Sequence, residues 1–182
     1  MPTEQKILDV IVPKQVQDNW CWAAVAVGIA TAYGDKNVFQ CDTAAHVLNT
    51  VCCPAGKHDA CDKPHTLAEA LNLKSHFQAQ LNNANSRTFP FVKENIDKGH
   101  PIAVRIDWKE GKTGHFVVIS GYRVIGNVPE IFVCDPFIGG RGIPVPIKQF
   151  TTNYQTLGSW DLTFQTIGTQ PVPECNNAHP CA

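Results

Sequence analysis

The chain has 182 residues, with 15 Lys and Arg against 16 Asp and Glu, and a formal net charge of -1. No long run of one charge sign occurs, which disfavours nucleic acid and anionic lipid as partners, and the length suits one domain over residues 1–182 with its own core. The longest apolar run, Trp20–Tyr33, is shorter than the roughly 20 residues of a membrane-spanning helix, so we predict no membrane partner.

The N-terminal stretch MPTEQKILDVIV lacks a basic flank, an apolar segment and a small-residue cleavage site. We therefore expect either an export signal that has been trimmed or another delivery route. The following stretch, QVQDNWCWAAVAVGIATAYG, predicts a helix from Asn19 or Trp20 to Gly34. The side chain of Asp18 or Asn19 is its expected N-terminal cap, and glycine suits its left-handed exit.

Three more helices are predicted before residue 100. The first covers Thr43–Asn49. The second opens with TLAE, where Thr66 and Glu69 have the spacing of a capping box, and it runs to about residue 73. The last begins at Pro90 in FPFVKENIDKG and ends at Gly99.

Six of the eight cysteines lie in two loop-like clusters: Cys41, Cys52, Cys53, Cys61, Cys175 and Cys181. This usage is typical of an oxidising compartment, so we expect a secreted or periplasmic protein, which includes one delivered as an effector. Cys52 and Cys53 are neighbours whose mutual bridge would be strained, and each is expected to pair with Cys41, Cys61 or a more distant cysteine. Cys175 and Cys181 are candidates to close a small loop near the C-terminus.

Zinc binding is the alternative for the segment CCPAGKHDACDKPH. Its possible ligands are Cys52, Cys53, His58, Cys61 and His65. Their spacings match no standard zinc-finger pattern. We therefore expect no metal and no cofactor.

After residue 100 the sequence changes from helical to strand patterns. PIAVRIDW, HFVVISGYRV and EIFVCDPF are short runs rich in Val, Ile and Phe, and VIGNVP between the last two predicts a hairpin turn. A later pair, GIPVPI and SWDLTFQTI, is expected at the sheet edges, where the prolines of the first are tolerated. The predicted class is α+β, with a helical part at about 15–99, an antiparallel sheet at about 100–168, and a disulfide-linked tail at about 169–182.

Cys21 is the candidate nucleophile. It lies in the first turn of the long helix, where unpaired backbone N–H groups and the helix dipole favour a thiolate over a thiol. Because cysteine is also among the most buried residue types, position alone leaves core packing as the alternative.

A nucleophilic thiolate needs an imidazole that accepts its proton and returns it to the leaving group, and seven histidines are available. Five stand in helical or loop contexts with polar neighbours, and His100 has nothing beside it to orient its ring. His115 differs, because the loop KEGKTG delivers it to the start of an apolar strand. We therefore predict His115 as the base.

The predicted hairpin brings Asp135 opposite His115, within about three residues of register uncertainty. A carboxylate there would hold the imidazole in the correct tautomer, as the third member of a triad does. Alternation along the strand sends Asp135 to one face and Cys134 to the other, so Cys134 is predicted to pack. A side-chain amide before the helix, from Gln15 or Gln17, would join the N–H of Cys21 as an oxyanion donor.

These residues resemble the papain-like cysteine peptidases over most of the chain. That family carries a glutamine six residues before a Cys-Trp-Ala helix start, matched by Gln15 and by Cys21 with its neighbours, and this favours Gln15 over Gln17. Its histidine opens a strand, as GHFVVISGY does here, and its orienting Asn or Asp matches Asp135. The short build and NWCWAA are similar to the bacterial members, namely staphopain-like proteases, plant-pathogen effector proteases and peptidases that trim double-glycine leaders.

The resemblance implies a papain-like fold and a cysteine peptidase whose Cys21, His115, Asp135 and Gln15 are catalytic. Papain itself has Asn where Asp135 stands, which predicts that Asn would be tolerated there. A protein or peptide substrate is the implied partner, with a protein inhibitor or immunity protein as a second one. A cell-wall amidase, a deamidase and a transglutaminase-like toxin use the same triad and remain alternatives, as does a non-catalytic cysteine-rich binding module.

Overall fold

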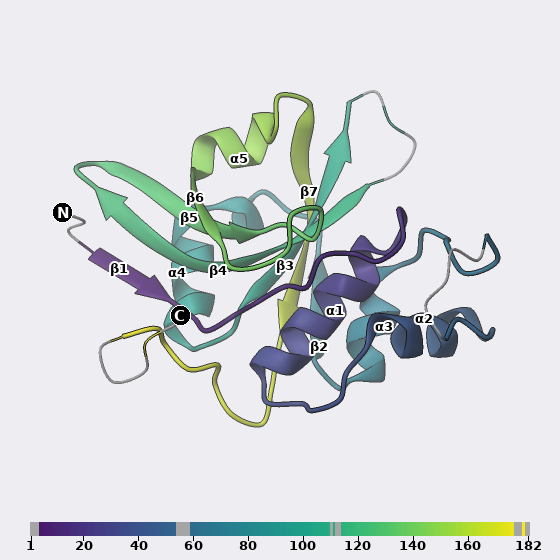
Figure 1. Ribbon diagram of the computed structural model, residues 1–182. Helices are drawn as coiled ribbons and strands as arrows, with labels where there is room; N and C mark the ends of the chain where they lie inside the picture. The colour runs from purple at the N-terminus through teal and green to yellow at the C-terminus, as the bar shows by residue number, and fades with distance from the viewer. Residues whose placement is uncertain (1–3, 54–58, 110, 112–113, 177–179, 181–182) are drawn as a thin grey trace.

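The computed structural model describes residues 4–53, 59–109, 111, 114–176 and 180, and it has the α+β organisation that the sequence predicts (Figure 1). The helices are α1 (Cys21–Ala32), α2 (Gln40–Leu48), α3 (Leu67–Leu73), α4 (Phe89–Asp97) and α5 (Ile147–Asn153). The strands are β1 (Glu4–Ile7), β2 (Phe77–Leu81), β3 (Ile102–Trp108), β4 (His115–Ile125), β5 (Val128–Cys134), β6 (Ile143–Pro146) and β7 (Gly158–Thr166).

Helix α1 is the central helix of the molecule, and its residues from Cys21 to Ala30 are all buried. An apolar circumference of this kind belongs to a helix with partners on every side. The helix is followed by Gly34 at a φ of +100°, which is the predicted left-handed exit. The predicted side-chain cap is wrong, because Trp20 occupies the cap position and its side chain makes no capping hydrogen bond. Asn19 instead donates its backbone N–H to Asp62 Oδ1 at 2.7 Å.

The other predicted helices form with small changes at their ends. Helix α2 begins at Gln40, three residues before the predicted start. Helix α3 follows Thr66 as predicted, but the Thr66 hydroxyl meets the Glu69 carboxylate at 3.5 Å and caps no backbone N–H, so the capping box is not formed. In α4 the proline lies in the first turn, and Thr88 Oγ1 accepts the N–H of Phe91 at 3.4 Å.

One antiparallel sheet contains the seven strands of the described chain, in the order β2-β7-β3-β4-β5-β6, and β1 pairs with the far part of β4. The β4–β5 hairpin turns at Gly126, and β6 lies at an edge with its two prolines, both as predicted. The prediction of an edge position for β7 is wrong. This strand is hydrogen-bonded on both sides, because β2, which the sequence patterns did not reveal, covers its outer side.

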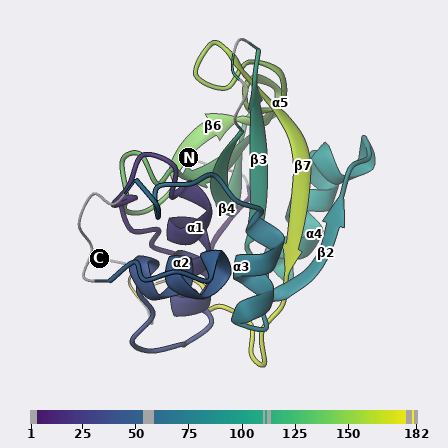
Figure 2. The same ribbon diagram turned by 90° about the vertical axis from the view of Figure 1, so that its right-hand side faces the viewer.

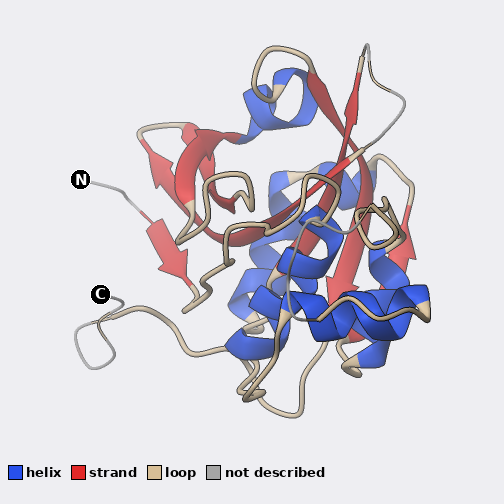
Figure 3. Cartoon of the chain, turned by 45° about the vertical axis from the view of Figure 1, so that its right-hand side comes forward, coloured by secondary structure: helices blue, strands red, loops and turns tan. Residues whose placement is uncertain are grey.

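The molecule has helices on both faces of the sheet. Helices α1, α2 and α3 pack together and cover one face, with α1 against β4, while α4 lies on the other face (Figures 2 and 3). Gly28 lets α1 approach the chain before it, since a Cβ there would lie 2.9 Å from Val12 Cγ2. The hydrophobic core includes Trp22 and Ile29 of α1 and Val104, Val117 and Val118 of the sheet.

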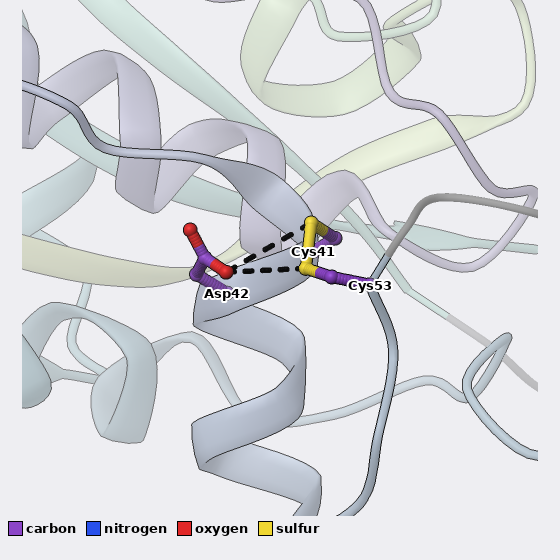
Figure 4. A group of neighbouring side chains, drawn as sticks. All are labelled: Cys41, Asp42 and Cys53. Carbon is purple, nitrogen blue, oxygen red and sulfur yellow. Dashed lines mark hydrogen bonds between the residues drawn. A yellow bond between two sulfur atoms is a disulfide. The ribbon is translucent and has the colours of Figure 1, made fainter.

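Two disulfides fasten the segment between α2 and α3. They join Cys41 to Cys53 and Cys52 to Cys61, so the predicted partners are confirmed. The zinc alternative is wrong for these cysteines, because they are bonded to one another; His58 lies outside the described residues. Figure 4 shows Asp42 directed at the Cys41–Cys53 bridge, with Oδ1 at 3.1 Å from Cys53 Sγ.

The two ends of the described chain meet beside β1. Cys175 donates its backbone N–H to the carbonyl of Ile7 at 2.7 Å, and Glu174 forms a bridge with Leu8. The predicted pairing of Cys175 with Cys181 involves a residue outside the described ones. Among the helices described, none has the length and apolar character to cross a membrane.

Candidate active site

Cys21 is the first residue of α1 and lines a cleft of about 550 Å³. It is a free thiol whose residue surface is 7% exposed. The first N–H groups of a helix have no acceptor inside the helix, and the N–H of Cys21 is one of them. The start of α1 therefore offers the cleft both a sulfur and a backbone donor.

His115 enters the same cleft from the sheet, as the first residue of β4. Its Nε2 lies 2.8 Å from Asp135 Oδ1, and the thiol of Cys21 is hydrogen-bonded to its ring. Because the hydrogen bond with Asp135 uses Nε2, the ring nitrogen that remains for the Cys21 thiol is Nδ1. The structure thus brings together Cys21, His115 and Asp135, three residues that are far apart in the chain.

The protonation of His115 follows from these contacts. Burial alone would lower the pKa of the imidazole, but hydrogen bonds with Asp135 and Cys21 and the charge of Asp135 outweigh burial and raise the pKa to about 9. The ring is therefore an imidazolium at neutral pH. An imidazolium next to a thiol favours the thiolate, which is the nucleophilic form.

Asp135 directly follows β5 and is only 4% exposed. Burial would raise the pKa of its carboxyl, but His115, the N–H of Phe137 and the hydroxyl of Tyr154 lower it below the usual value. The N–H of Phe137 lies 2.9 Å from Oδ1, and the Tyr154 hydroxyl lies 2.7 Å from Oδ2. Gln155 Nε2 donates to Oδ2 as well, at 3.1 Å. The carboxylate is therefore ionised and hydrogen-bonded on both oxygens.

The β4–β5 hairpin makes the predicted contact between His115 and Asp135, although the two are not paired residues. Val118 pairs with Cys134, so continuing this register by one residue places Asp135 opposite Val117, two residues from His115. The side chains of His115 and Asp135 span this offset and form the hydrogen bond. Cys134 lies 3.5 Å from Ser120 Oγ, and burial raises the pKa of its thiol to about 11. Cys134 is a packing residue, as predicted.

Aromatic rings cover the imidazole. The ring of Phe137 stacks on His115 at 4.3 Å between centroids, and Trp108 lies at 6.1 Å with an interplanar angle of 24°. Such shielding keeps water from the hydrogen bond between His115 and Asp135 and strengthens it. Neither aromatic residue was predicted for the site, although an aromatic residue two positions after Asp135 was a signal in the sequence.

Tyr154 and Gln155 were also missed. They lie in the connection between α5 and β7, about twenty residues after Asp135, and no local motif marks them. Tyr154 is 5% exposed, and a tyrosine that buried needs a partner for its hydroxyl, which here is the carboxylate.

Gln15, the predicted oxyanion donor, does not line the cleft in this structure. Its Nε2 donates to the carbonyls of Gln17 at 3.0 Å and Asp18 at 2.7 Å, so both amide hydrogens are bound by the loop that leads into α1. Its Oε1 is buried and has no hydrogen-bond partner within the described residues. Gln17, the other candidate, is buried at 4% exposure. The Gln15 amide would have to turn to reach the cleft.

The segment after the Cys52–Cys61 disulfide forms one wall of the cleft, which Pro64 and His65 line. The two tryptophans next to Cys21 hold this wall. Trp20 donates its indole N–H to the carbonyl of Cys61 at 2.6 Å, and Trp22 donates to the carbonyl of Lys63 at 3.0 Å. Both tryptophans are fully buried beside the site.

The opposite side of the cleft belongs to the sheet and is mostly apolar. Its lining includes Phe116, Leu162, Phe164 and Arg105, whose guanidinium is paired with Asp161 at 2.6 Å. His100, the second candidate for the base, lies elsewhere, with its ring 3.1 Å from the hydroxyl of Tyr33. The cleft beside Cys21 therefore has a loop wall on one side and a sheet wall on the other.

Comparisons with known proteins agree with this geometry. The sequence model of the Peptidase_C39 like family matches residues 7–161. Among solved structures, the chain is similar to one from a study of the mite allergens Blo t 1 and Der p 1, with a TM-score of 0.53 and 13% sequence identity, over 92% of this chain and 72% of that chain. The fold is therefore papain-like. The comparison with curated proteins found no match.

Proposed function

The chain belongs to the Peptidase_C39 like family and is a cysteine peptidase with a papain-like fold, and from that membership we propose that it cleaves peptide bonds with Cys21, His115 and Asp135. The observation that carries this proposal is the continuous contact from Cys21 through His115 to Asp135 in one cleft. Nucleophile, base and orienting residue come from α1, β4 and the end of β5, which are fixed by the core rather than by loops.

In the proposed reaction, Cys21 Sγ attacks the carbonyl carbon of the substrate, and the C=O π electrons move to the oxygen. His115 donates its Nδ1 proton to the leaving nitrogen as the C–N bond breaks, which releases an amine and leaves a thioester on Cys21. The neutral imidazole then takes a proton from water, whose oxygen attacks the thioester. The products are a free acid and the restored pair of thiolate and imidazolium.

The oxyanion requires donors at the place where its charge develops. We propose the N–H of Cys21 as the first donor, since it belongs to the unpaired first turn of α1. Gln15 is the proposed second donor. Its amide lies in the loop just before the helix and reaches the cleft by exchanging its bond with the Asp18 carbonyl for one with the substrate.

The test compares two free cysteines of the same chain. Cys21→Ala should abolish cleavage of a denatured protein substrate and leave the melting temperature near that of the wild type. Cys134→Ala is the matched control, because that thiol is also buried but lies outside the cleft, so it should retain activity. Iodoacetamide at mildly acidic pH should label Cys21 stoichiometrically. Cleavage by Cys21→Ala, or labelling of Cys134 in place of Cys21, would contradict the proposal.

We also propose an oxidising site of action, which means secretion, a periplasmic location or delivery as an effector. Two disulfides support it, since such bonds persist where the cytosolic thiol systems do not act. The substrate is a protein or peptide, and a protein inhibitor or immunity protein would have to block the same cleft. Purified peptidoglycan digested in parallel separates this activity from that of a cell-wall amidase, which would release wall peptides without proteolysis.

A further inference from the structure

The connection between α5 and β7 reaches across the sheet to the far oxygen of Asp135. Tyr154 bonds Oδ2 through its hydroxyl, and Gln155 bonds the same oxygen through Nε2. The turn is closed by two backbone hydrogen bonds of 2.8 Å between Tyr154 and Gly158. Inside it, Gln155 and Thr156 have φ values of +46° and +71°, which are uncommon for residues other than glycine. Such conformations concentrate at functional sites.

Among the described residues, every group that is hydrogen-bonded to the Asp135 side chain is a donor. Oδ1 accepts from His115 Nε2 and from the backbone N–H of Phe137, while Oδ2 accepts from Tyr154 and Gln155. An ionised carboxylate is acceptor-only and has room for two bonds on each oxygen, so this set is fully matched. A carboxamide has one acceptor atom and one donor atom, and it cannot satisfy four donors.

We propose that Tyr154 and Gln155 are positioning residues that clamp the Asp135 carboxylate, so that this enzyme requires Asp and rejects Asn at that position. The inference rests on the proposed function of Cys21, His115 and Asp135. It also reverses the expectation, drawn from the resemblance to papain, that Asn would be tolerated.

Replacing the Asp135 carboxylate with a carboxamide changes which atoms at this position donate and accept hydrogen bonds. With Asn at position 135, the carbonyl oxygen has to face His115 and Phe137 to keep the imidazole oriented. The Nδ2 group then points at Gln155 Nε2, and it finds an acceptor only if the Gln155 amide turns over or the Tyr154 hydroxyl stops donating. The alternative orientation puts Nδ2 against His115 Nε2 and destroys the hydrogen bond that fixes the tautomer. Either arrangement dismantles the contacts that hold the carboxylate: the first costs the donor role of Gln155 or Tyr154, and the second costs the hydrogen bond to His115.

The deciding experiment is an exchange of charge between positions 135 and 155. Asp135→Asn should lower kcat/KM on a peptide substrate by about 100-fold, as loss of oriented proton transfer does. Gln155→Glu alone should lower it roughly tenfold, because a second carboxylate beside Asp135 disfavours its ionised form. The double variant D135N/Q155E should recover at least about tenfold over D135N, since the carboxylate introduced at position 155 accepts the Nδ2 hydrogens of the carboxamide introduced at position 135. Undiminished activity in D135N, or no recovery in the double variant, would overturn the proposal.

Tyr154→Phe removes one donor to Oδ2 and changes little else. It should raise the pKa of Asp135 and so move the acid limb of the rate of Cys21 alkylation by iodoacetamide to higher pH, by about one unit. Tyr33→Phe is the matched control, because that hydroxyl bonds Thr166 at 2.8 Å far from the cleft and should leave the pH profile unchanged. Equal profiles for the two tyrosine variants would contradict the clamp.

The variants Cys21→Ala and D135N separate the proposed function from the clamp. If Cys21→Ala still cleaves the substrate, the proposed function is wrong whatever the clamp variants do. If Cys21→Ala is inactive while D135N is as active as the wild type, the proposed function stands and the clamp is wrong. Melting temperatures of all variants identify any that fail to fold, and alkylation of Cys21 by iodoacetamide reads the site without a substrate.

Discussion

His115 and Asp135 share a buried hydrogen bond of 2.8 Å, and against the effect of burial this bond and the contact with Cys21 raise the pKa of the imidazole. Because the pKa of His115 is raised to about 9, we expect kcat/KM to fall as the pH rises through about 9, where the imidazolium loses its proton. The measurement is a pH profile of kcat/KM.

His115→Ala should lower activity by about 10² to 10⁴-fold, whereas His100→Ala should leave the kinetics unchanged. A loss with His100→Ala instead would move the base to that residue.

The same pair makes folding stability depend on pH. His115 has a folded pKa above its unfolded value, so its stabilising contribution is complete below about 6.5 and is lost as the pH rises through about 9. Asp135 has a folded pKa below its unfolded value, so its contribution is present above about 4 and is lost at lower pH. The pair therefore stabilises the fold most between about pH 4 and about pH 6.5. Denaturant titrations at several pH values would measure this dependence.

Gln15 offers a separate test of the oxyanion site. Gln15→Ala should lower kcat by about 10² to 10³-fold with little change in KM, because a donor to the developing charge acts mainly in the transition state. Gln17→Ala is a control for damage to the loop. If kcat falls equally in both variants, Gln15 only braces the carbonyls that it contacts in the present structure.

The sequence was informative for those site residues that have a local signal. Cys21 stands at a helix start. His115 opens one strand and Asp135 directly follows the next, and the single turn between these strands lets register arguments bring His115 and Asp135 together. Tyr154 and Gln155 approach Asp135 across a separate helix and turn. Their role depends on tertiary packing alone, and no spacing in the sequence indicates it.

At the level of elements, the wall that begins at Cys61 carries a prediction of its own. The double variant C52A/C61A should lose about 2–4 kcal/mol of stability, as removal of a disulfide commonly does, and its kcat/KM should fall roughly tenfold or more because Trp20 and Trp22 lose a fixed partner.

The other disulfide supplies the matched control. C41A/C53A removes a bridge that closes a loop of similar length. It leaves Cys61 bridged, and the carbonyls of Cys61 and Lys63 are the ones that accept the tryptophan indole N–H groups. Its stability should fall by a comparable amount, whereas kcat/KM of the folded enzyme should stay near the wild-type value. Kinetics in C52A/C61A that match those in C41A/C53A would show that the wall does not shape the site.

Helices and strands were predictable to different degrees. Helix α1 was clear because its apolar run is long, and β4 and β5 because their turn is explicit. The strand β7 was placed at an edge since β2, with its alternating FQAQL, gave too short a signal to be recognised as its neighbour. Helix α5 was missed for a similar reason, as its seven residues follow two prolines and resemble a continuing strand.

On the scale of the whole molecule, the site exists only where the helical layer meets the sheet, since Cys21 comes from one and His115 from the other (Figure 1). A peptide aldehyde should bind across this junction, its carbon forming a bond with Cys21 Sγ. At 100 times its Kd, such a ligand adds about 2.7 kcal/mol of stability, or roughly 5–10 °C in Tm for a chain of this size.

Thermal unfolding with the aldehyde, and with the corresponding peptide alcohol as the control, measures this effect. The alcohol cannot form the covalent bond and should give a smaller shift at the same concentration. In Cys21→Ala the two ligands should behave alike. A large aldehyde shift that survives in Cys21→Ala would place the ligand elsewhere.

The two bridges of the α2–α3 segment interleave, since Cys52 and Cys53 are neighbours that bond to partners in opposite directions along the chain. A slip by one residue would give an isomer, Cys41 with Cys52 and Cys53 with Cys61, of identical mass. In that isomer the carbonyl of Cys61 would no longer lie where it accepts the indole N–H of Trp20. Protein recovered by oxidative refolding should therefore contain an inactive fraction that peptide mapping of the crosslinks detects and that a disulfide isomerase converts to active enzyme.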